Sequence, residues 1–342
     1  MKTLSRNWQI FGIILGAAAG FAAGVFLLGA QRAADDISVP ILPYYSETWK
    51  NPKETAMLSL NFSPYYPDGA DPELQSPVSE ETIRSALDAV APFTDTIRTF
   101  GVSGEMYKLY KIAKEEYGFR IIAGCWIGAL YGEAEIADEL EILAGLGNDN
   151  LADILVVGSE GLYRRDYGAD SLIGWVNEVK GALTEYKPVG VSDTAGMLMK
   201  YPDLLRAVDV ALFTYYPYFD GVDVKKAVTA FDKTYNSLRQ VSPRTVFICS
   251  ETGWKFFGDS VGRASVGPEE AAAYIEGILG YSRSAGLEVC IFEAVEEKWK
   301  MKYNDGGWGL LDENLAVRPA VKDLLARIAP ESAAGDTPSA VK

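Results

Sequence analysis

Histidine is absent from all 342 residues of the sequence. Its absence excludes Ser-His-Asp and Cys-His nucleophilic catalysis, zinc sites with histidine ligands, and acid–base catalysis by imidazole. Any proton transfer must therefore depend mainly on carboxylates, tyrosine, lysine or cysteine. The remaining composition, with 48% apolar and 23% charged residues, is typical of a globular protein.

Cysteine is also scarce, with Cys125, Cys249 and Cys290 far apart in the chain. Each lies inside an apolar run, and none belongs to a Cys-x-x-Cys pair. Isolated thiols of this kind are typical of small buried side chains on core strands. The cysteines therefore indicate no metal site, and the two-carboxyl chemistry argued below requires no metal ion and no organic cofactor.

Positive charge is in deficit, with 32 Lys and Arg against 47 Asp and Glu. Residues 1–32 hold three basic groups and no acid, so the rest of the chain has 29 basic and 47 acidic residues, a net charge of −18. A body this acidic repels phosphate backbones, which argues against nucleic acid as a partner. It favours a neutral or cationic substrate.

An uncharged run of 21 residues, Ile10–Ala30, lies near the N-terminus. At about 1.5 Å per residue, a helix of this length spans the hydrocarbon core of a bilayer. Lys2 and Arg6 precede the run and predict that the N-terminus stays cytoplasmic. We expect a single-pass anchor in the inner membrane, with the globular domain in the periplasm or outside the cell. The alternative is secretion after signal cleavage, although the apolar region of a signal peptide is normally about 7–15 residues long.

The predicted organisation has five parts: a cytoplasmic segment 1–9, a transmembrane helix 10–30, a proline-containing linker 31–54, a globular domain 55–329 and a disordered tail 330–342. Glycines at spacing i, i+4 in the apolar run, Gly16, Gly20 and Gly24, would permit a weak dimer of packed helices. Small residues in an ordinary lone anchor are an equally good explanation.

Short apolar or β-branched runs alternate with amphipathic segments throughout residues 55–329. The expected strands are Met57–Phe62, Thr96–Phe100, Arg120–Trp126, Ile154–Gly158, Pro188–Ser192, Val208–Tyr215, Thr245–Ser250 and Val289–Ala294. The expected helices are Glu80–Val90, Gly104–Tyr117, Glu133–Leu146, Ser171–Glu185, a short one at Leu198–Arg206, Lys225–Leu238, Pro268–Ser284 and Ala316–Ile328.

Eight strands that alternate with helices predict an α/β fold of the (β/α)₈ TIM-barrel type, whose usual length is about 250 residues. A doubly wound open sheet is the alternative. That fold normally has a glycine-rich phosphate loop after its first strand, whereas this chain has NFSPYYPDG there.

Acidic and aromatic residues gather where the predicted strands end, the edge at which barrel enzymes carry their chemistry. Glu160 follows the fourth strand and Glu251 the seventh, and each comes directly after an apolar run. A protonated carboxyl and an ionised one, surrounded by aromatic rings, are the components that glycoside hydrolysis requires. A single acid after a strand is often only a solvated loop residue, but the two together favour catalysis.

Five motifs in order resemble glycoside hydrolase family 17, the β-1,3-glucanases and related glucanosyltransferases, in its bacterial and fungal branch. They are DTIRTFG (Asp95–Gly101), VGSEGLYR (Val157–Arg164), SETGW (Ser250–Trp254), FEAVEEKWK (Phe292–Lys300) and WGLLDENLAVRP (Trp308–Pro319). The resemblance covers roughly residues 58–319 and supports the barrel prediction.

The resemblance implies a retaining mechanism, with Glu160 as acid/base and Glu251 as nucleophile. It implies that Tyr215 or Tyr216 donates a hydrogen bond to the nucleophile, and that Arg98 orients the carboxylates. Glu297 matches the third acid of the family, which with Glu293, Glu296 and Lys300 would order the site and contact sugar hydroxyls. A structural ion-pair network is the alternative for that group. Candidate walls of the sugar subsites are Tyr66, Asp68, Trp126, Tyr163, Trp254 and Trp308.

One position departs from the common pattern of the wider clan. Asn usually precedes the acid/base and binds the sugar 2-hydroxyl, whereas here the residue is Ser159. The shorter side chain predicts a contact that is weaker, water-mediated or made by another residue, and not a loss of activity.

The sequence therefore predicts a membrane-anchored retaining hydrolase of β-1,3-glucan, of the glucan β-1,3-glucosidase type. One alternative is a glucanosyltransferase, in which a sugar hydroxyl replaces water. Another is a non-catalytic glucan-binding barrel, which the presence of both glutamates disfavours. A purely structural scaffold would leave the aromatic and acidic strand ends without an explanation.

Overall fold

The computed structural model describes residues 58–74 and 76–328 of the chain. The predicted membrane span 10–30, the linker 31–54 and the tail 330–342 lie outside the described residues. Within the described part, no helix is both long enough and apolar enough to cross a membrane. The membrane anchor and the location of the domain therefore stay predictions.

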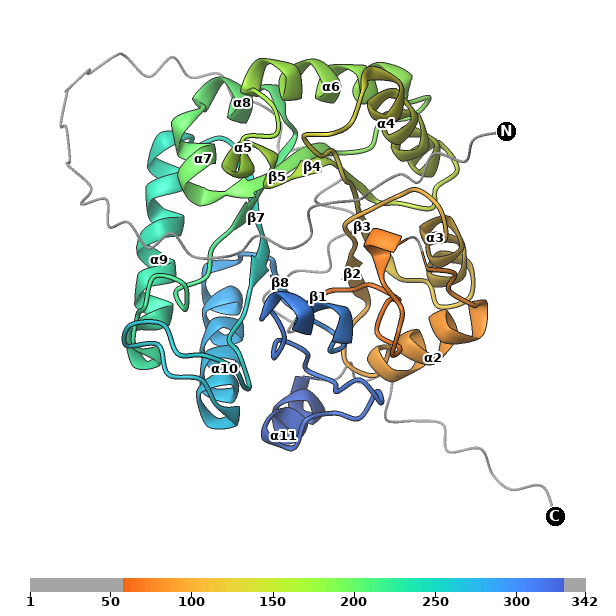
Figure 1. Cartoon of the computed structure of the whole chain (residues 1–342). Helices are drawn as coiled ribbons and strands as arrows, with labels where there is room; N and C mark the ends of the chain where they lie inside the picture. Colours follow the sequence, from red (N-terminus) through yellow and green to blue (C-terminus); the bar gives the residue numbers. More distant parts are fainter. Residues whose placement is uncertain (1–57, 75, 329–342) are drawn as a thin grey trace.

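Eight parallel strands form a closed barrel in which neighbours along the chain are neighbours in the sheet (Figure 1). β8 pairs with β1 and closes the ring. This confirms the predicted (β/α)₈ barrel. The strands are β1 (Ser59–Asn61), β2 (Thr96–Arg98), β3 (Arg120–Cys125), β4 (Ile154–Ser159), β5 (Val189–Thr194), β6 (Val210–Thr214), β7 (Val246–Thr252) and β8 (Val289–Ile291).

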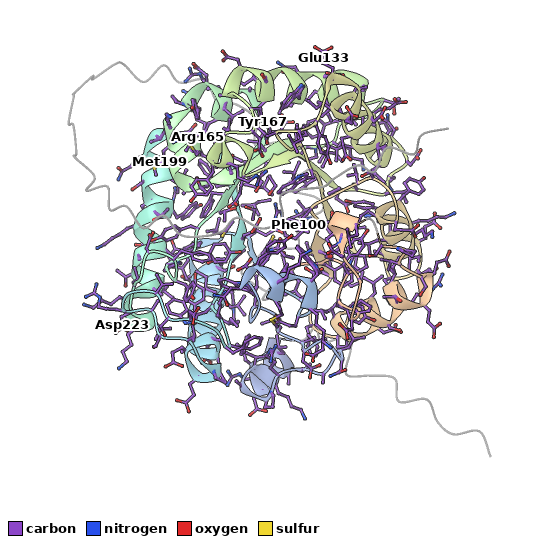
Figure 2. All side chains as sticks on the ribbon, viewed as in Figure 1. Phe100, Glu133, Arg165, Tyr167, Met199 and Asp223 are labelled. Carbon is purple, nitrogen blue, oxygen red and sulfur yellow. The ribbon has the colours of Figure 1, made fainter. Side chains whose placement is uncertain are left out.

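A ring of helices surrounds the barrel (Figure 1). Those of ten residues or more are α2 (Glu80–Val90), α3 (Met106–Glu115), α4 (Glu133–Asn148), α6 (Ala169–Ala182), α9 (Val224–Val241), α10 (Pro268–Ala285) and α11 (Pro319–Ile328). The shorter elements are α5 (Gly161–Arg164), α7 (Ala195–Lys200), α8 (Pro202–Ala207) and the 3₁₀ turns η1 (Pro72–Leu74) and η2 (Lys298–Tyr303). Figure 2 shows Glu133 and Asp223, at the starts of α4 and α9, on the outer rim and Phe100 near the centre.

Local chemistry explains where the helices begin and end. The hydroxyl of Ser79 accepts a hydrogen bond from the Thr82 backbone N–H, which caps α2. Pro268 occupies the first turn of α10, and Gly286 ends that helix in the left-handed conformation. The single short helix predicted over Leu198–Arg206 is wrong, because the chain forms α7 and α8 there. Pro202 lacks a backbone N–H and fits only the first turn of a new helix.

The inside of the barrel has an apolar layer below and a polar layer above. Inward side chains of β3, β4, β6, β7 and β8 form the apolar layer, which consists of Ile122, Ile154, Val156, Val210, Leu212, Ile248 and Cys290. One step further along the strands the inward side chains become Asn61, Arg98, Ser192, Thr214 and Ser250, all buried. Because alternate residues of a strand face the same side, these polar groups meet at the carboxyl end of the barrel.

The regular pairing of the strands is interrupted at the ends that carry the two candidate glutamates. The register shifts between Val157 and Ser159 on β4 and between Cys249 and Thr252 on β7. An irregularity of this kind bends a strand and re-aims the side chains that follow it. Here it precedes Glu160 on one strand and includes Glu251 on the other.

Candidate active site

A cavity of about 280 Å³ opens at the carboxyl end of the barrel. Seven of the predicted site residues line it: Trp126, Ser159, Glu160, Tyr163, Glu251, Glu297 and Lys300. They come from the ends of β3, β4 and β7 and from the loop after β8. The barrel thus brings together residues that are up to 174 positions apart in the sequence.

Arg98 is the fully buried cation beneath this cavity. Its Nη1 donates to Glu251 Oε1 and to Asn61 Oδ1, each at 2.8 Å. Its Nη2 lies 3.2 Å from Ser159 Oγ and 3.3 Å from Ser192 Oγ. A guanidinium held on four sides has one orientation, so Arg98 both fixes the Glu251 carboxylate and balances its charge.

The two adjacent tyrosines after β6 point in different directions. The Tyr216 hydroxyl donates to Glu251 Oε2 at 3.2 Å, and burial beside Glu251 raises the pKa of Tyr216 well above its usual range. The Tyr215 hydroxyl instead donates to Asp220 Oδ2 at 2.9 Å. Tyr216 is therefore the hydrogen-bond donor to Glu251, and Tyr215 does not line the cavity.

Glu160 stands directly after β4 with φ 53° and ψ 19°, in the left-handed region. A residue with a Cβ rarely adopts this conformation, which costs roughly 1 kcal/mol or more. Two backbone hydrogen bonds hold it, from Glu160 N to Ser192 O and from Arg164 N to Glu160 O, each 2.9 Å long. The left-handed turn directs the carboxyl into the cavity that Glu251 also lines.

Burial raises the pKa of Glu160 to about 8, and the negative charges of Glu251 and Asp193 add to the effect. Arg164 and a hydrogen bond with Thr214 oppose the rise without cancelling it. At neutral pH the Glu160 carboxyl is therefore mostly protonated. The Glu251 carboxylate has the charge of Arg98 at 2.8 Å and the Tyr216 hydroxyl as partners. The cavity thus holds one proton donor and one charged carboxylate.

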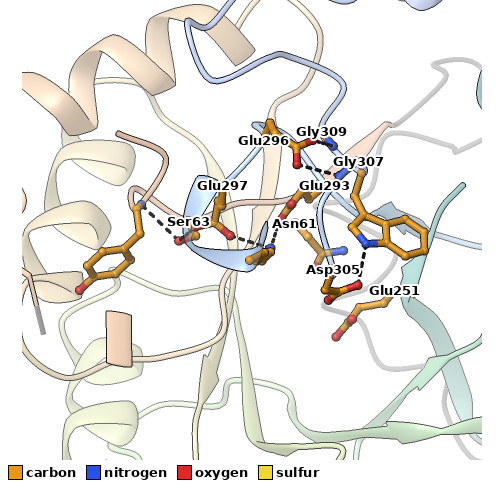
Figure 3. Close-up of polar contacts among 12 residues, drawn as sticks. Asn61, Ser63, Glu251, Glu293, Glu296, Glu297, Asp305, Gly307 and Gly309 are labelled. Atoms are coloured by element: carbon orange, nitrogen blue, oxygen red, sulfur yellow. Dashed lines mark hydrogen bonds and ion pairs between the residues drawn. The ribbon is translucent and has the colours of Figure 1, made fainter. Parts of the chain in front are cut away.

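The loop after β8 adds a buried cation between two acids. Lys300 Nζ contacts Glu293 and lies 2.6 Å from Glu297 Oε2. Ser63 Oγ donates to Glu297 Oε1 at 2.6 Å, and Figure 3 shows Ser63, Glu293 and Glu297 together. Burial by itself would raise the pKa of Glu297, but the charge of Lys300 and the hydrogen bonds outweigh it, so the pKa lies below the usual value. Burial raises the pKa of Glu293 well above its usual range despite Lys300. Of the two acids, Glu297 is the charged one, and it lines the cavity.

Glu296 belongs to the loop and not to the cavity wall. Its carboxylate accepts from the backbone N–H groups of Gly307 and Gly309 at 2.7 and 3.1 Å (Figure 3). Arg318 Nη2 donates to the same carboxylate at 3.1 Å. These contacts fold the segment 305–311 against the barrel, which agrees with the alternative of a structural ion pair for this residue.

Four of the predicted subsite residues lie away from the cavity wall. Trp254 and Trp308 are each only 1% exposed, because they pack with Tyr218 in the hydrophobic core outside the cavity. Their indole N–H groups donate to Ser265 O and Asp305 Oδ1. Tyr66 is buried and donates to Thr82 O, and Asp68 lies exposed near Lys298. These four residues therefore do not line this cavity, and their role in sugar subsites stays a prediction.

Several cavity residues were missed in the sequence. They are Ser63, Tyr65, Pro72, Phe100, Gly101, Ser103, Gly104, Glu105, Met106, Arg164, Phe292, Trp299 and Asp305. Tyr65 and Trp299 lie inside predicted strand-end motifs, so a signal for them existed. The motif does not indicate whether each of these side chains points into the cavity or away from it.

Comparison with known protein families gives one match over most of the described chain. The model of the BtgE/BtgC glycoside hydrolase domain matches residues 59–309. A curated relative, the putative glucan endo-1,3-beta-glucosidase btgC of Aspergillus niger, is 26% identical over 284 residues, which cover 73% of this chain. The chain spans only 41% of that relative's length. The glucan 1,3-beta-glucosidase of Schizosaccharomyces pombe is 28% identical over 63% of this chain and 71% of its own.

Solved structures show the same fold. The glycoside hydrolase family 17 beta-1,3-glucanosyltransferase from Rhizomucor miehei has a TM-score of 0.68 at 22% identity, over 78% of this chain and 96% of its own. An endo-laminarinase from Formosa has a TM-score of 0.70 at 19% identity, over 80% of this chain and 87% of its own.

Proposed function

Since the chain belongs to the BtgE/BtgC glycoside hydrolase domain family, we propose that it is a retaining glycosidase acting on β-1,3-glucan. The family match and the curated relatives confirm the resemblance to glycoside hydrolase family 17 that the motifs indicated. One curated relative is named as a putative glucan endo-1,3-beta-glucosidase and the other as a glucan 1,3-beta-glucosidase, which supports the choice of substrate.

The observation that carries the proposal is the different state of the two carboxyls in one cavity. Glu160 is held mostly protonated at neutral pH by burial and by neighbouring charge. Glu251 lies 2.8 Å from a fully buried guanidinium. Neither metal chemistry nor an imidazole is needed for a reaction that a donor carboxyl and a nucleophilic carboxylate perform together.

In the first half-reaction, a Glu251 oxygen attacks the anomeric carbon and forms a covalent glycosyl–enzyme. The bond from that carbon to the leaving oxygen breaks, and Glu160 gives its proton to that oxygen. In the second half-reaction, Glu160 takes a proton from water or from a sugar hydroxyl, whose oxygen attacks the anomeric carbon. The ester bond to Glu251 breaks, and both carboxyls return to their starting states.

The surrounding residues have separate tasks in this mechanism. Arg98 and Tyr216 hold Glu251 in the orientation for attack. Glu297, charged and aimed at the cavity, is placed to accept hydrogen bonds from sugar hydroxyls. Trp126 and Trp299 line the cavity and are the aromatic residues placed to contact a sugar ring there, with Arg164 over one face of Trp126.

The pH dependence of the rate follows from the Glu160 proton. The first half-reaction requires protonated Glu160, and its pKa is raised to about 8. We therefore expect kcat/KM to be level at neutral pH and to fall about tenfold per pH unit once the pH is well above 8. Rates on a soluble β-1,3-gluco-oligosaccharide between pH 5 and 10 would measure this. An alkaline limb centred at pH 5 or below would contradict the assignment of Glu160 as the acid.

The products identify which acceptor completes the reaction. The globular part, from about residue 33 onward, is incubated with defined β-1,3-gluco-oligosaccharides beside its Glu251→Gln variant, and the products are sized over time. Shorter products from the wild type alone are the expected result and indicate hydrolysis. Products longer than the starting sugar would indicate a glucanosyltransferase, and Tyr163, 52% exposed on the cavity rim beside Glu160, could hold the acceptor. Folded protein that leaves the sugars unchanged would contradict the proposed substrate.

A further inference from the structure

Asp193 is a fully buried carboxylate that lines no part of the cavity. It lies on β5 next to Ser192, whose side chain faces into the barrel and contacts Arg98. Because side chains alternate along a strand, Asp193 faces outward, to the side where α5 packs against β5. Burial of a charged carboxyl costs free energy, so its place beneath α5 calls for a reason.

The Asp193 carboxylate accepts backbone hydrogen bonds from two segments, the turn after β4 and the end of its own strand β5. Its Oδ2 accepts from the Leu162 backbone N–H at 2.9 Å, and its Oδ1 accepts from that of Thr194 at 2.8 Å. The Tyr163 backbone N–H adds a third hydrogen bond. Leu162 and Tyr163 are the second and third residues after Glu160, so the carboxylate fixes the turn that places Glu160.

The same turn is held from its other side by an aromatic ring. Gly158 has φ +72°, and a Cβ there would lie 2.1 Å from the Tyr167 hydroxyl oxygen. A Cβ on Gly161 would lie 2.1 Å from Tyr167 Cζ. The ring can pack against residues 158–161 only because both positions are glycine. Arg164 completes the arrangement, with Nη2 2.8 Å from Ser159 O.

We propose that Asp193 is the positioning residue of the acid/base: it fixes Glu160 in the left-handed conformation and places a negative charge beside it. The inference rests on the proposed function for its catalytic meaning. The geometry itself, in which the Asp193 carboxylate joins the backbone of the turn after Glu160 to the end of β5, is independent of the substrate.

The charges around both groups agree with this role. The acidic groups that interact with Glu160 are Glu251, Asp193 and Tyr216, and the cation that interacts with it is Arg164. Asp193 has Arg164, Tyr167 and Glu160 as its ionisable neighbours. Burial raises the pKa of Asp193 to about 6, so it is mostly charged at neutral pH. Its charge then disfavours ionisation of Glu160 and keeps the acid protonated.

The test compares Asp193→Asn with the wild type and with Asp209→Asn. Asp209 serves as the control because its carboxylate also accepts a backbone N–H, that of Val189 at 3.0 Å, and pairs with Lys180 at 2.9 Å, but it precedes β6 at the opposite end of the barrel. The first readout is the titration of Glu160, followed by NMR on protein with ¹³C-labelled glutamate carboxyls. The spectrum of Glu160→Gln identifies the resonance.

We expect the midpoint of the Glu160 titration to fall in Asp193→Asn by roughly one pH unit, a tenfold change in its acid dissociation constant, and to stay unchanged in Asp209→Asn. The alkaline limb of kcat/KM should move by the same amount. A residue with a merely structural role would lower the rate at every pH and leave the limb in place. An unchanged Glu160 midpoint in folded Asp193→Asn would overturn the proposal.

The wild type supplies a second measurement in case Asp193→Asn does not fold. If the two carboxyls interact, the Glu160 resonance must show a smaller inflection near pH 6, where Asp193 titrates. A single-step curve would overturn the proposal. The NMR readout does not need turnover, so a coupled titration in a protein that leaves β-1,3-glucan intact would contradict the proposed function and support the role of Asp193.

Discussion

Glu251→Gln is expected to lower kcat on β-1,3-gluco-oligosaccharides by about four orders of magnitude or more, the usual size of the loss when a catalytic nucleophile is removed. An amide is nearly the same shape as a carboxylate but does not attack an anomeric carbon. The Gln oxygen can still accept from Arg98, whose Nη1 lies 2.8 Å from Glu251 Oε1. Binding of the oligosaccharide should therefore change little, which titration calorimetry would measure.

Stability is the quantity that must be separated from activity in this variant. Arg98 is fully buried, and loss of the opposite charge leaves it without its ionic partner. Removal of one member of a buried pair costs about 3–5 kcal/mol when no hydrogen bond replaces it, and the amide should keep the cost below that range. Thermal unfolding with and without oligosaccharide gives the folded fraction for which the rate is corrected.

Glu296→Gln is the matched control for this substitution. Glu296 is also a buried glutamate with an arginine partner, Arg318 at 3.1 Å, but it does not line the cavity. We expect this variant to lose stability and to keep its rate per folded molecule. Equal losses of rate in both variants would mean that a disturbed loop, and not a lost nucleophile, explains the effect.

Glu160→Ala should show the second-largest effect, and its size should depend on the leaving group. On oligosaccharides the rate should fall roughly 10²–10⁴-fold, the usual contribution of a general acid. Aryl β-glucosides with acidic phenols need no proton from the enzyme, so their first half-reaction should stay fast. The second half-reaction lacks its base and becomes limiting, and a burst of phenol from one turnover should precede the slow phase.

Azide separates the roles of the two glutamates. In Glu160→Ala the anion can enter the space that the side chain leaves and attack the glycosyl–enzyme without a base. The bond to Glu251 then breaks, and the product is a β-glycosyl azide with retained configuration. In Glu251→Ala the same anion would attack the substrate directly and give the α-azide. If Glu160→Ala gave no rescue on an activated substrate, or gave the α-product, its assignment as acid/base would be wrong.

Much of the fold was predictable because its signal is local and repeated. Apolar runs such as ILVVG at 154–158 must be covered on both faces, and the segments between them have helical periodicity. Eight such pairs in series leave few topologies other than a closed parallel barrel. The error at α7 and α8 is local as well, since Pro202 marks the start of a new helix.

The direction of individual side chains was less predictable. A strand-end motif specifies which residues leave the sheet, but an irregularity of one residue reverses the side on which each of them lies. That is why the pair Tyr215 and Tyr216 was ambiguous in the sequence. It is also why Trp254 and Trp308, which look like sugar platforms, turn inward and pack behind the nucleophile.

The sequence by itself determined the chemistry that this protein can use. It has no histidine, its acids follow apolar strands, and its motifs occur in the order of one glycosidase family. Only the tertiary structure decided which groups act on one another. Arg98 and Glu251 are 153 residues apart, and their charges interact because barrel closure places β2 and β7 around one buried layer. The protonation of a carboxyl depends on burial and on charges a few ångströms away, and both are properties of the folded chain.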